Sequence, residues 1–295
     1  MAADAGSLGP HRTVSSRLRS RPDPSDAETL DRPLLRPRCA WIVGGVWLAL
    51  TGWAGAQTRP LQTEEATTAP RGTSVIEVGA EAIRNEPNFV TGGLRERWAG
   101  PILRFVYSAA DNVEIDVEWT ARVGQRDDPD FGSVSDWGDV GLRAKVRLVD
   151  EGHGHPAIGA RFGVLLPETS FGNGLGPNAL RMSAQILVSQ TIGGVTLHGN
   201  AGLALHDEVY RPHEQRDFLA YGLAAEVRLS RRLGVVGEWA GLAGSGMPGA
   251  DAHGELRAGV RWGAGEWRVD GALRRGLLAA DGTWGVAAGV TRRFR

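Results

Sequence analysis

The sequence predicts an all-β fold, a transmembrane antiparallel up-and-down β-barrel of about 12 strands that follows an N-terminal signal peptide. Three features predict it: segments in which apolar and polar residues alternate, connections that alternate in length, and one long apolar run near the N-terminus. The mean hydropathy of −0.21 agrees with a barrel, because residues facing the lumen alternate with residues facing lipid.

The apolar run spans residues 39–56 and reads CAWIVGGVWLALTGWAGA. Arg36 and Arg38 precede it and the small residues AGA end it, so it has the basic, apolar and cleavage parts of a secretory signal peptide. A membrane-anchor helix is the alternative interpretation. We assign residues 1–56 to an N-terminal extension and signal peptide.

Residues 57–73, QTRPLQTEEATTAPRGT, are polar and broken by proline, which predicts a disordered periplasmic lead-in before a barrel over residues 74–295. The clearest strand is NVEIDVEWTARV from Asn112, where every second residue is apolar. A helix would spread its charges around the circumference, whereas a strand puts them on one face. Twelve such segments are expected, at 74–82, 94–108, 112–123, 138–150, 156–167, 179–192, 195–206, 217–229, 233–241, 254–262, 266–275 and 283–294.

The connections between these segments alternate between long and short. Long ones contain RNEPNFV, GQRDDPDFGSVSD, PETSFGNGLGPN, DEVYRPHEQ, AGSGMPGADA and GLLAADG, and the short ones are AADN, EGHGH, GG, SRR and GAG. Long outer loops alternate with tight periplasmic turns in a barrel whose termini are both periplasmic. A lipocalin-like or immunoglobulin-like fold shares the strand pattern but not this order.

Aromatic residues are expected in two girdles at the ends of the strands, where rings lie at the membrane interfaces. The outer girdle would hold Trp119, Tyr221, Trp239 and Trp284, and the periplasmic girdle Tyr107, Trp262, Trp267 and Phe294. The final strand, TWGVAAGVTRRFR, ends with Phe294 next to last and resembles the terminal signal of barrel proteins. Outer-membrane lipid and the barrel-assembly machinery are therefore the expected partners.

The totals exclude several other functions. A net charge of −1 gives no reason to expect nucleic acid as a partner, and the single Cys39 excludes an intrachain disulfide framework and Cys-rich metal sites. We expect no cofactor and no metal. His153 and His155 flank Gly154 in a short turn, without a firm third ligand.

Charged residues on the polar faces of the strands are the candidate lumen-lining residues. The acidic row of one strand and the basic row of the next would face each other if the two strands form a hairpin, which predicts cross-strand ion pairs. Such a ladder either sets permeation selectivity or stiffens a narrow barrel. The candidates are Glu114, Asp116, Glu118, Arg143, Lys145, Arg147, Arg161, Arg181, His198, Arg228, Glu238, Arg257, Arg261 and Arg268.

Two chemical alternatives remain weak on the sequence. His198 could serve an outer-membrane hydrolase together with Ser183 or Ser189, which share its face of the predicted sheet, but no spacing typical of such enzymes accompanies it. The glycine-rich loop at residues 172–177 lacks both the following helix and the lysine of a phosphate-binding loop. We expect no enzyme.

Residues 137–206 carry a family resemblance. The matching features are Gly138-Asp139, the strand end LPET at 166–169, the glycine-rich loop and the strand VTLHGN at 195–200. This segment resembles the MetA-pathway of phenol degradation family of outer-membrane barrels, which are also described as transporters. The resemblance implies a bacterial outer-membrane channel for passive uptake of small hydrophobic or aromatic compounds. A non-conducting structural, adhesive or assembly barrel is the alternative.

Overall fold

The computed structural model describes residues 59–211 and 213–295. The predicted signal peptide, including its apolar region at 39–56, lies outside the described residues. Within the described ranges, no helix is long and apolar enough to cross a membrane.

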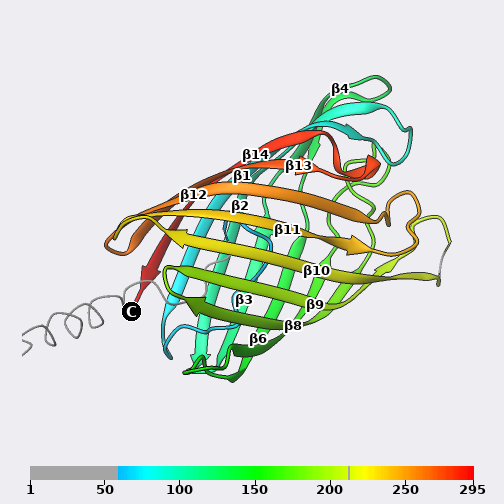
Figure 1. The fold of residues 1–295 in the computed structure, drawn as a ribbon. Coiled ribbons are helices and arrows are strands. Elements are labelled where there is room, and N and C mark those ends of the chain that lie inside the picture. Colours follow the sequence, from blue (N-terminus) through cyan, green and yellow to red (C-terminus); the bar gives the residue numbers. More distant parts are fainter. Residues whose placement is uncertain (1–58, 212) are drawn as a thin grey trace, which may run out of the picture. The chain divides into compact units, whose positions relative to one another are not determined.

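The described chain is a closed antiparallel β-barrel of twelve strands, as predicted (Figure 1). Each strand pairs with its neighbours along the chain, and β1 closes the barrel on β14 with Ser74 opposite Phe294. The strands are β1 (Ser74–Pro87), β2 (Leu94–Ala110), β3 (Val113–Thr120), β4 (Val123–Asp128), β5 (Gly132–Asp136), β6 (Val140–Val149), β7 (Ala157–Leu166), β8 (Arg181–Ile192), β9 (Val195–Asp207), β10 (Gln215–Arg228), β11 (Leu233–Ala243), β12 (His253–Ala264), β13 (Trp267–Gly276) and β14 (Trp284–Phe294).

Fourteen assigned strands make twelve barrel strands because two of them are interrupted. β4 continues the course of β3, and β5 leads into β6, so that β4 and β5 form a hairpin beyond the β3–β6 pair. The sequence predicts a loop here, and that part of the prediction is wrong. The sequence does not reveal the hairpin because its residues, GQRDD and GSVSD, are polar and lack an apolar face.

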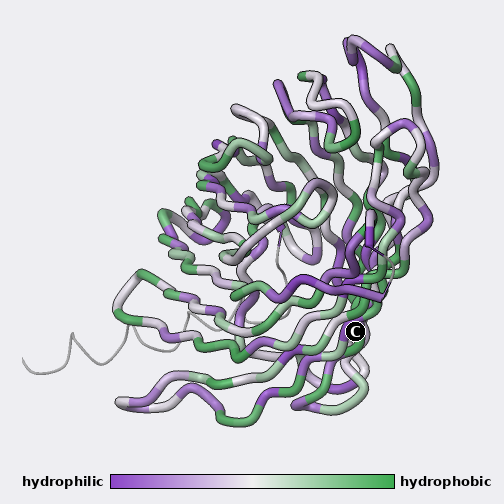
Figure 2. Tube along the Cα trace, turned by 90° about the vertical axis from the view of Figure 1, so that its right-hand side faces the viewer, coloured by the Kyte–Doolittle hydropathy of each residue, from purple (hydrophilic) through white to green (hydrophobic). Residues whose placement is uncertain are grey.

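The barrel is apolar outside and polar inside. Leu203, Leu219 and Leu273 are 60%, 51% and 63% exposed, while charged side chains such as Glu77 and Asp270 are 0% and 3% exposed. Figure 2 shows hydrophobic and hydrophilic positions alternating along the strands. Each of the twelve barrel strands exposes large apolar side chains, which would be costly in water, so this outer surface requires a lipid environment.

Both ends of the barrel follow the predicted arrangement. The end that holds Ser74 and Phe294, called here the terminal end, has short connections such as 193–194 and 265–266, and the opposite loop end has the long ones. Exposed tryptophans lie near both ends: Trp119, Trp239 and Trp284 toward the loop end, and Trp262 and Trp267 toward the terminal end. The expected alternation of long and short connections is confirmed, and the periplasmic position of the terminal end stays a prediction.

Residues 59–73 differ from the predicted disordered lead-in. They lie inside the barrel, where Leu61, Ala66 and Ala69 are buried with exposures of 5%, 0% and 0%. The sequence does not reveal this location because the segment has no periodic apolar pattern, and its contacts are with strands far along the chain. We call residues 59–73 the plug segment.

Candidate functional site

The backbone of the plug segment bonds to carboxylates of the barrel wall. The N–H of Gln62 donates to both carboxylate oxygens of Glu238 at 2.8 and 2.9 Å. The N–H of Ala69 donates to Oε1 of Glu114 at 2.6 Å. A buried backbone donor without a partner is costly, so wall carboxylates take the place of a β-ladder for this irregular segment.

Wall arginines bind the carbonyl groups at the start of the segment. Arg257 donates to the Pro60 carbonyl at 3.0 Å, and Nε of Arg261 donates to the Arg59 carbonyl at 3.0 Å. Nη2 of Arg268 reaches the same Arg59 carbonyl at 3.1 Å. The predicted lumen-lining arginines therefore hold the plug segment in addition to facing the lumen.

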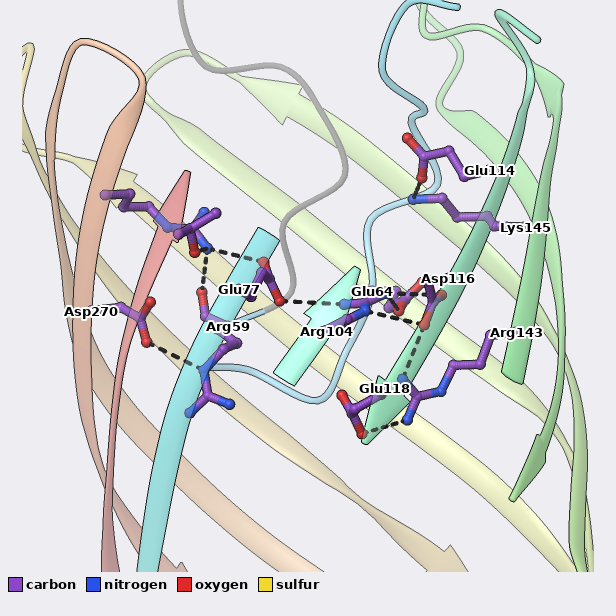
Figure 3. A network of polar contacts seen from close by, with 12 residues as sticks. Arg59, Glu64, Glu77, Arg104, Glu114, Asp116, Glu118, Arg143, Lys145 and Asp270 are labelled. Atoms are coloured by element: carbon purple, nitrogen blue, oxygen red, sulfur yellow. Dashed lines mark hydrogen bonds and ion pairs between the residues drawn. The ribbon is translucent and has the colours of Figure 1, made fainter. Parts of the chain in front are cut away.

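Glu64 is the main ionic contact between the plug segment and the wall (Figure 3). Its Oε1 lies 2.8 Å from Nη2 of Arg104 and 3.4 Å from Nη2 of Arg161. Arg104 also binds Asp116 at 3.1 Å. Burial alone would raise the pKa of Glu64. The positive charges of Arg161, Arg104 and Lys145 together outweigh this effect, so the pKa lies well below its ordinary value. Glu64 is therefore ionised in its site.

Small wall residues make room for the segment. A Cβ on Gly222 would lie 2.5 Å from Oγ1 of Thr63, and a Cβ on Gly159 would lie 3.2 Å from the carbonyl oxygen of Ala66. Larger side chains on these faces would collide with the plug segment. The glycines of the lumen face thus shape the barrel around its N-terminal segment.

The predicted ion-pair ladder between β3 and β6 is confirmed. The two strands pair with Glu114 opposite Lys145 and Asp116 opposite Arg143. Nζ of Lys145 lies 2.8 Å from Glu114, and Arg143 lies 3.1 Å from Asp116 and 2.8 Å from Glu118. Figure 3 shows this ladder beside the contacts of the plug segment. Most of its charge is neutralised within the wall.

Most candidate lumen residues lie on the buried face of the barrel, but two lie at its terminal end. Arg228 is exposed because it is the last residue of β10, next to the turn. Arg147 binds the Asp111 carbonyl at 2.9 Å and pairs with Asp150 there. The candidates on the buried face are Glu114, Asp116, Lys145, His198, Glu238, Arg257, Arg261 and Arg268. Glu118, Arg143, Arg161 and Arg181 line the interior and are partly accessible.

Two of the three residues considered for a hydrolase, Ser189 and His198, lie in contact. Oγ of Ser189 lies 2.8 Å from Nδ1 of His198, and both side chains are buried at 2% and 8% exposure. The Ser189 hydroxyl also accepts a 2.8 Å hydrogen bond from the Ala66 N–H. Ser183 takes no part in this pair. The pair therefore serves as a hydrogen-bonding support under the plug segment.

No metal site is found in the described ranges, 59–211 and 213–295, where no three His, Cys, Asp or Glu side chains are grouped suitably. His153 and His155 lie in the turn between β6 and β7, and their side chains are exposed. Gly152 and His155 form an isolated bridge there. This exposed segment is a turn that connects β6 to β7.

A cavity of about 570 Å³ lies inside the barrel on the loop-end side of the plug segment. Residues 59–64 of that segment line it together with strand residues that carry both signs of charge. It extends to Glu86 and Asp281 near the loop end. The plug segment thus separates this cavity from the terminal end of the lumen.

Several interior residues were not among the sequence candidates. Arg104, Glu77, Glu255 and Arg274 are buried at 7%, 0%, 6% and 9% exposure. Arg274 pairs with Glu255 at 2.9 Å, and Arg104 lies 3.7 Å from Glu77. Arg104 and Glu77 belong to the first two strands, where the alternation is weakest. The signal that marks them is their polar position between outward-facing neighbours, such as Leu103 and Phe105 around Arg104.

Comparisons with solved structures place the fold among outer-membrane barrels. The COG4313 outer membrane channel from Pseudomonas putida F1 is similar with a TM-score of 0.61 and 15% sequence identity, covering 79% of this chain and 100% of that chain. The translocator domain of autotransporter NalP from Neisseria meningitidis is similar with a TM-score of 0.47 and 13% identity, covering 77% and 90%. The CymD monoaromatic hydrocarbon channel has a TM-score of 0.41 and 10% identity, covering 77% and 90%.

Sequence comparisons give no match. No protein family model matches the chain. No curated protein matches it either. The fold is therefore shown by the structural likeness, while the family suggested by residues 137–206 stays a resemblance.

Proposed function

We propose that the protein is a passive channel of the bacterial outer membrane for small molecules, including hydrophobic or aromatic compounds. The observation that carries the proposal is the cavity of about 570 Å³ enclosed by a lipid-facing barrel. Cavities of roughly 300–1,000 Å³ hold small organic ligands. The family resemblance of residues 137–206 supports the hydrophobic or aromatic class.

The plug segment acts as the internal constriction in this proposal. Its contacts with the strands are hydrogen bonds, ion pairs and the packing of Leu61, Ala66 and Ala69. None of them is a β-ladder, so the segment can move while the barrel stays closed. With the terminal end facing the periplasm, solutes enter from the loop end and leave past Arg59–Glu64. The final strand ending at Phe294 would be the signal read by the barrel-assembly machinery.

Solute flux into proteoliposomes tests the channel. We expect the refolded protein to admit small solutes, and replacement of residues 60–69 by a Gly/Ser linker of equal length to raise both the rate and the size limit. Protein-free liposomes give the baseline. Absence of flux for every solute through the unmodified protein would overturn the channel.

A sealed structural barrel is the second candidate, and the buried plug segment is the observation that favours it. Glu64 and Thr63 are 3% and 4% exposed, which leaves little free space around the segment itself. The linker replacement separates the two: a sealed barrel conducts only after the replacement, whereas a channel conducts before it. The buried Ser189–His198 pair is assigned to support of the plug segment, and we propose no hydrolytic activity.

A further inference from the structure

The cavity has two chemically different walls. On β10 and β11 its lining is small and apolar, with Ala220, Ala240 and Leu242 on the inner face. On β7 and β8 it is cationic, with Arg161 and Arg181. A cavity with one apolar and one cationic wall matches a molecule that has an apolar body and an anionic group.

Arg181 is the cation in this cavity that lacks a carboxylate partner. Among the described residues, no Asp or Glu oxygen lies within ion-pair distance of it, whereas Arg104, Arg143, Arg257 and Arg274 each pair with two or more carboxylates. Its guanidinium is therefore available to a ligand.

The acidic residue that most nearly offsets this charge is already engaged. Asp139 acts on Arg181 only at long range, and its Oδ1 accepts hydrogen bonds from the Glu168 N–H at 3.0 Å, the Thr169 N–H at 3.1 Å and the Thr169 hydroxyl at 2.8 Å. Asp251 also acts on Arg181 only at long range, and Arg97, which adds positive charge nearby, pairs with Glu86 at 3.8 Å. Among the described residues, no carboxylate therefore neutralises the Arg181 guanidinium by direct contact.

Arg161 extends the cationic wall toward the plug segment. Within residues 59–211 and 213–295, its one ion pair is the 3.4 Å contact with Glu64, and its buried Nε has no hydrogen-bond partner. It lies opposite Gln185 in the β7–β8 pair, and Gln185 and Arg181 share the inner face of β8. A ligand oxygen held by Arg181 would therefore lie on the loop-end side of the Gln185 amide and the Arg161 guanidinium.

We propose that this β7–β8 wall is a carboxylate-recognition site, so that the solute of the channel is a small monocarboxylate with an apolar body. Arg181 would bind the carboxylate through its planar guanidinium, and the apolar body would lie against Ala220 and Ala240. Guanidinium groups suit carboxylates because two parallel N–H donors match two oxygens. This inference rests on the proposed function and narrows its substrate class.

Equilibrium binding to the refolded full chain in detergent micelles tests the site, using isothermal titration of benzoate and benzamide. The two probes share a ring and differ in charge. We expect benzoate to bind about tenfold more tightly than benzamide, which corresponds to roughly one charge-assisted hydrogen bond. Arg181→Gln should reduce the affinity for benzoate to that for benzamide, and Arg181→Lys should keep part of the preference.

Arg231→Gln, in the exposed turn after β10, is the matched control and should leave both affinities unchanged. Equal affinities in the unmodified protein, or a benzoate preference that persists in Arg181→Gln, would overturn the inference. A folded barrel is checked by its heat-modifiable mobility on gels. Benzoate binding without solute flux would overturn only the channel, and flux without a carboxylate preference would overturn only this site.

Discussion

The carboxylate of Glu64 lies 2.8 Å from the guanidinium of Arg104 and joins the plug segment to the wall of the barrel. Glu64 is 3% exposed and Arg104 is 7% exposed, so the pair is shielded from bulk water. Arg104 belongs to β2, and the second partner of Glu64, Arg161, belongs to β7. One plug carboxylate therefore bridges two distant strands.

Glu64→Gln should loosen the plug segment. Loss of one partner of a buried ion pair typically costs about 3–5 kcal/mol, and we expect about 3 kcal/mol here because Arg161 is partly accessible from the cavity. In planar bilayers, the Glu64→Gln variant should have a higher and more strongly fluctuating conductance than the unmodified protein, because its plug segment is held less firmly. Denaturant unfolding measures the loss of stability on the same preparation.

Glu266→Gln is the control, since Glu266 is exposed in the turn between β12 and β13. It should change neither conductance nor stability. Unchanged conductance in Glu64→Gln together with the expected loss of stability would mean that the segment does not limit the current.

The Glu114–Lys145 pair should show strong energetic coupling. Glu114→Gln and Lys145→Met each leave a buried charge without its 2.8 Å partner, whereas the double variant removes both charges. We expect a coupling free energy of about 1–3 kcal/mol in a double-mutant cycle, measured by denaturant unfolding. Additive effects would show that the pair adds nothing to stability.

These two carboxylates differ in how well the sequence reveals them. Glu114 lies in a strand with strict alternation, and a hairpin register then places it opposite Lys145. Glu64 lies in QTEEATT, which has no period, and its position depends on contacts with β2 and β7 that no local pattern encodes. Local physics thus predicts the wall, and tertiary contacts alone determine what fills it.

The β4–β5 hairpin makes the same point for the fold. Strands that face lipid need an apolar side, and this need makes them visible in a sequence. The residues 123–128 and 132–136 extend beyond the β3–β6 pair and have no such need. Polar composition with Asp, Gly and Pro therefore predicts a loop where the backbone in fact pairs.

Arginine substitutions along β8 should separate the centre of the lipid-facing surface from its edge. Ile186 and Ile192 are similarly exposed, at 51% and 60%, but Ile186 is central and Ile192 ends the strand. Ile186→Arg should destabilise the barrel by about 2–4 kcal/mol and Ile192→Arg by about 0–1 kcal/mol, as at the midplane and interface of other barrels.

Unfolding in lipid vesicles measures this difference, with Ile192→Arg as the matched control for the added charge. A β8 that crosses the bilayer requires the larger loss at its centre. Equal losses at both positions would contradict the assignment of this face to lipid.

Stability should depend on acid through Asp281 in the loop before β14. Its carboxylate accepts hydrogen bonds from Nδ1 of His253 at 2.8 Å, the Leu278 N–H at 2.8 Å and the Gly254 N–H at 3.1 Å. Burial alone would raise the pKa of Asp281, but these hydrogen bonds lower it below the ordinary 3.8. A lowered pKa means that folding favours the ionised carboxylate.

The stability that Asp281 contributes is therefore present above the ordinary carboxyl pKa and is lost as the pH falls below it toward the lowered value. Asp281→Asn should lower the free energy of unfolding by about 2 kcal/mol near neutral pH, the scale of hydrogen bonds to a charged group. The difference from the unmodified protein should stay constant down to about pH 5 and shrink below about pH 4. Asp130→Asn, in the turn of the β4–β5 hairpin, has no such contacts and should show no difference at any pH; a difference for Asp281→Asn that grows in acid would contradict the assignment.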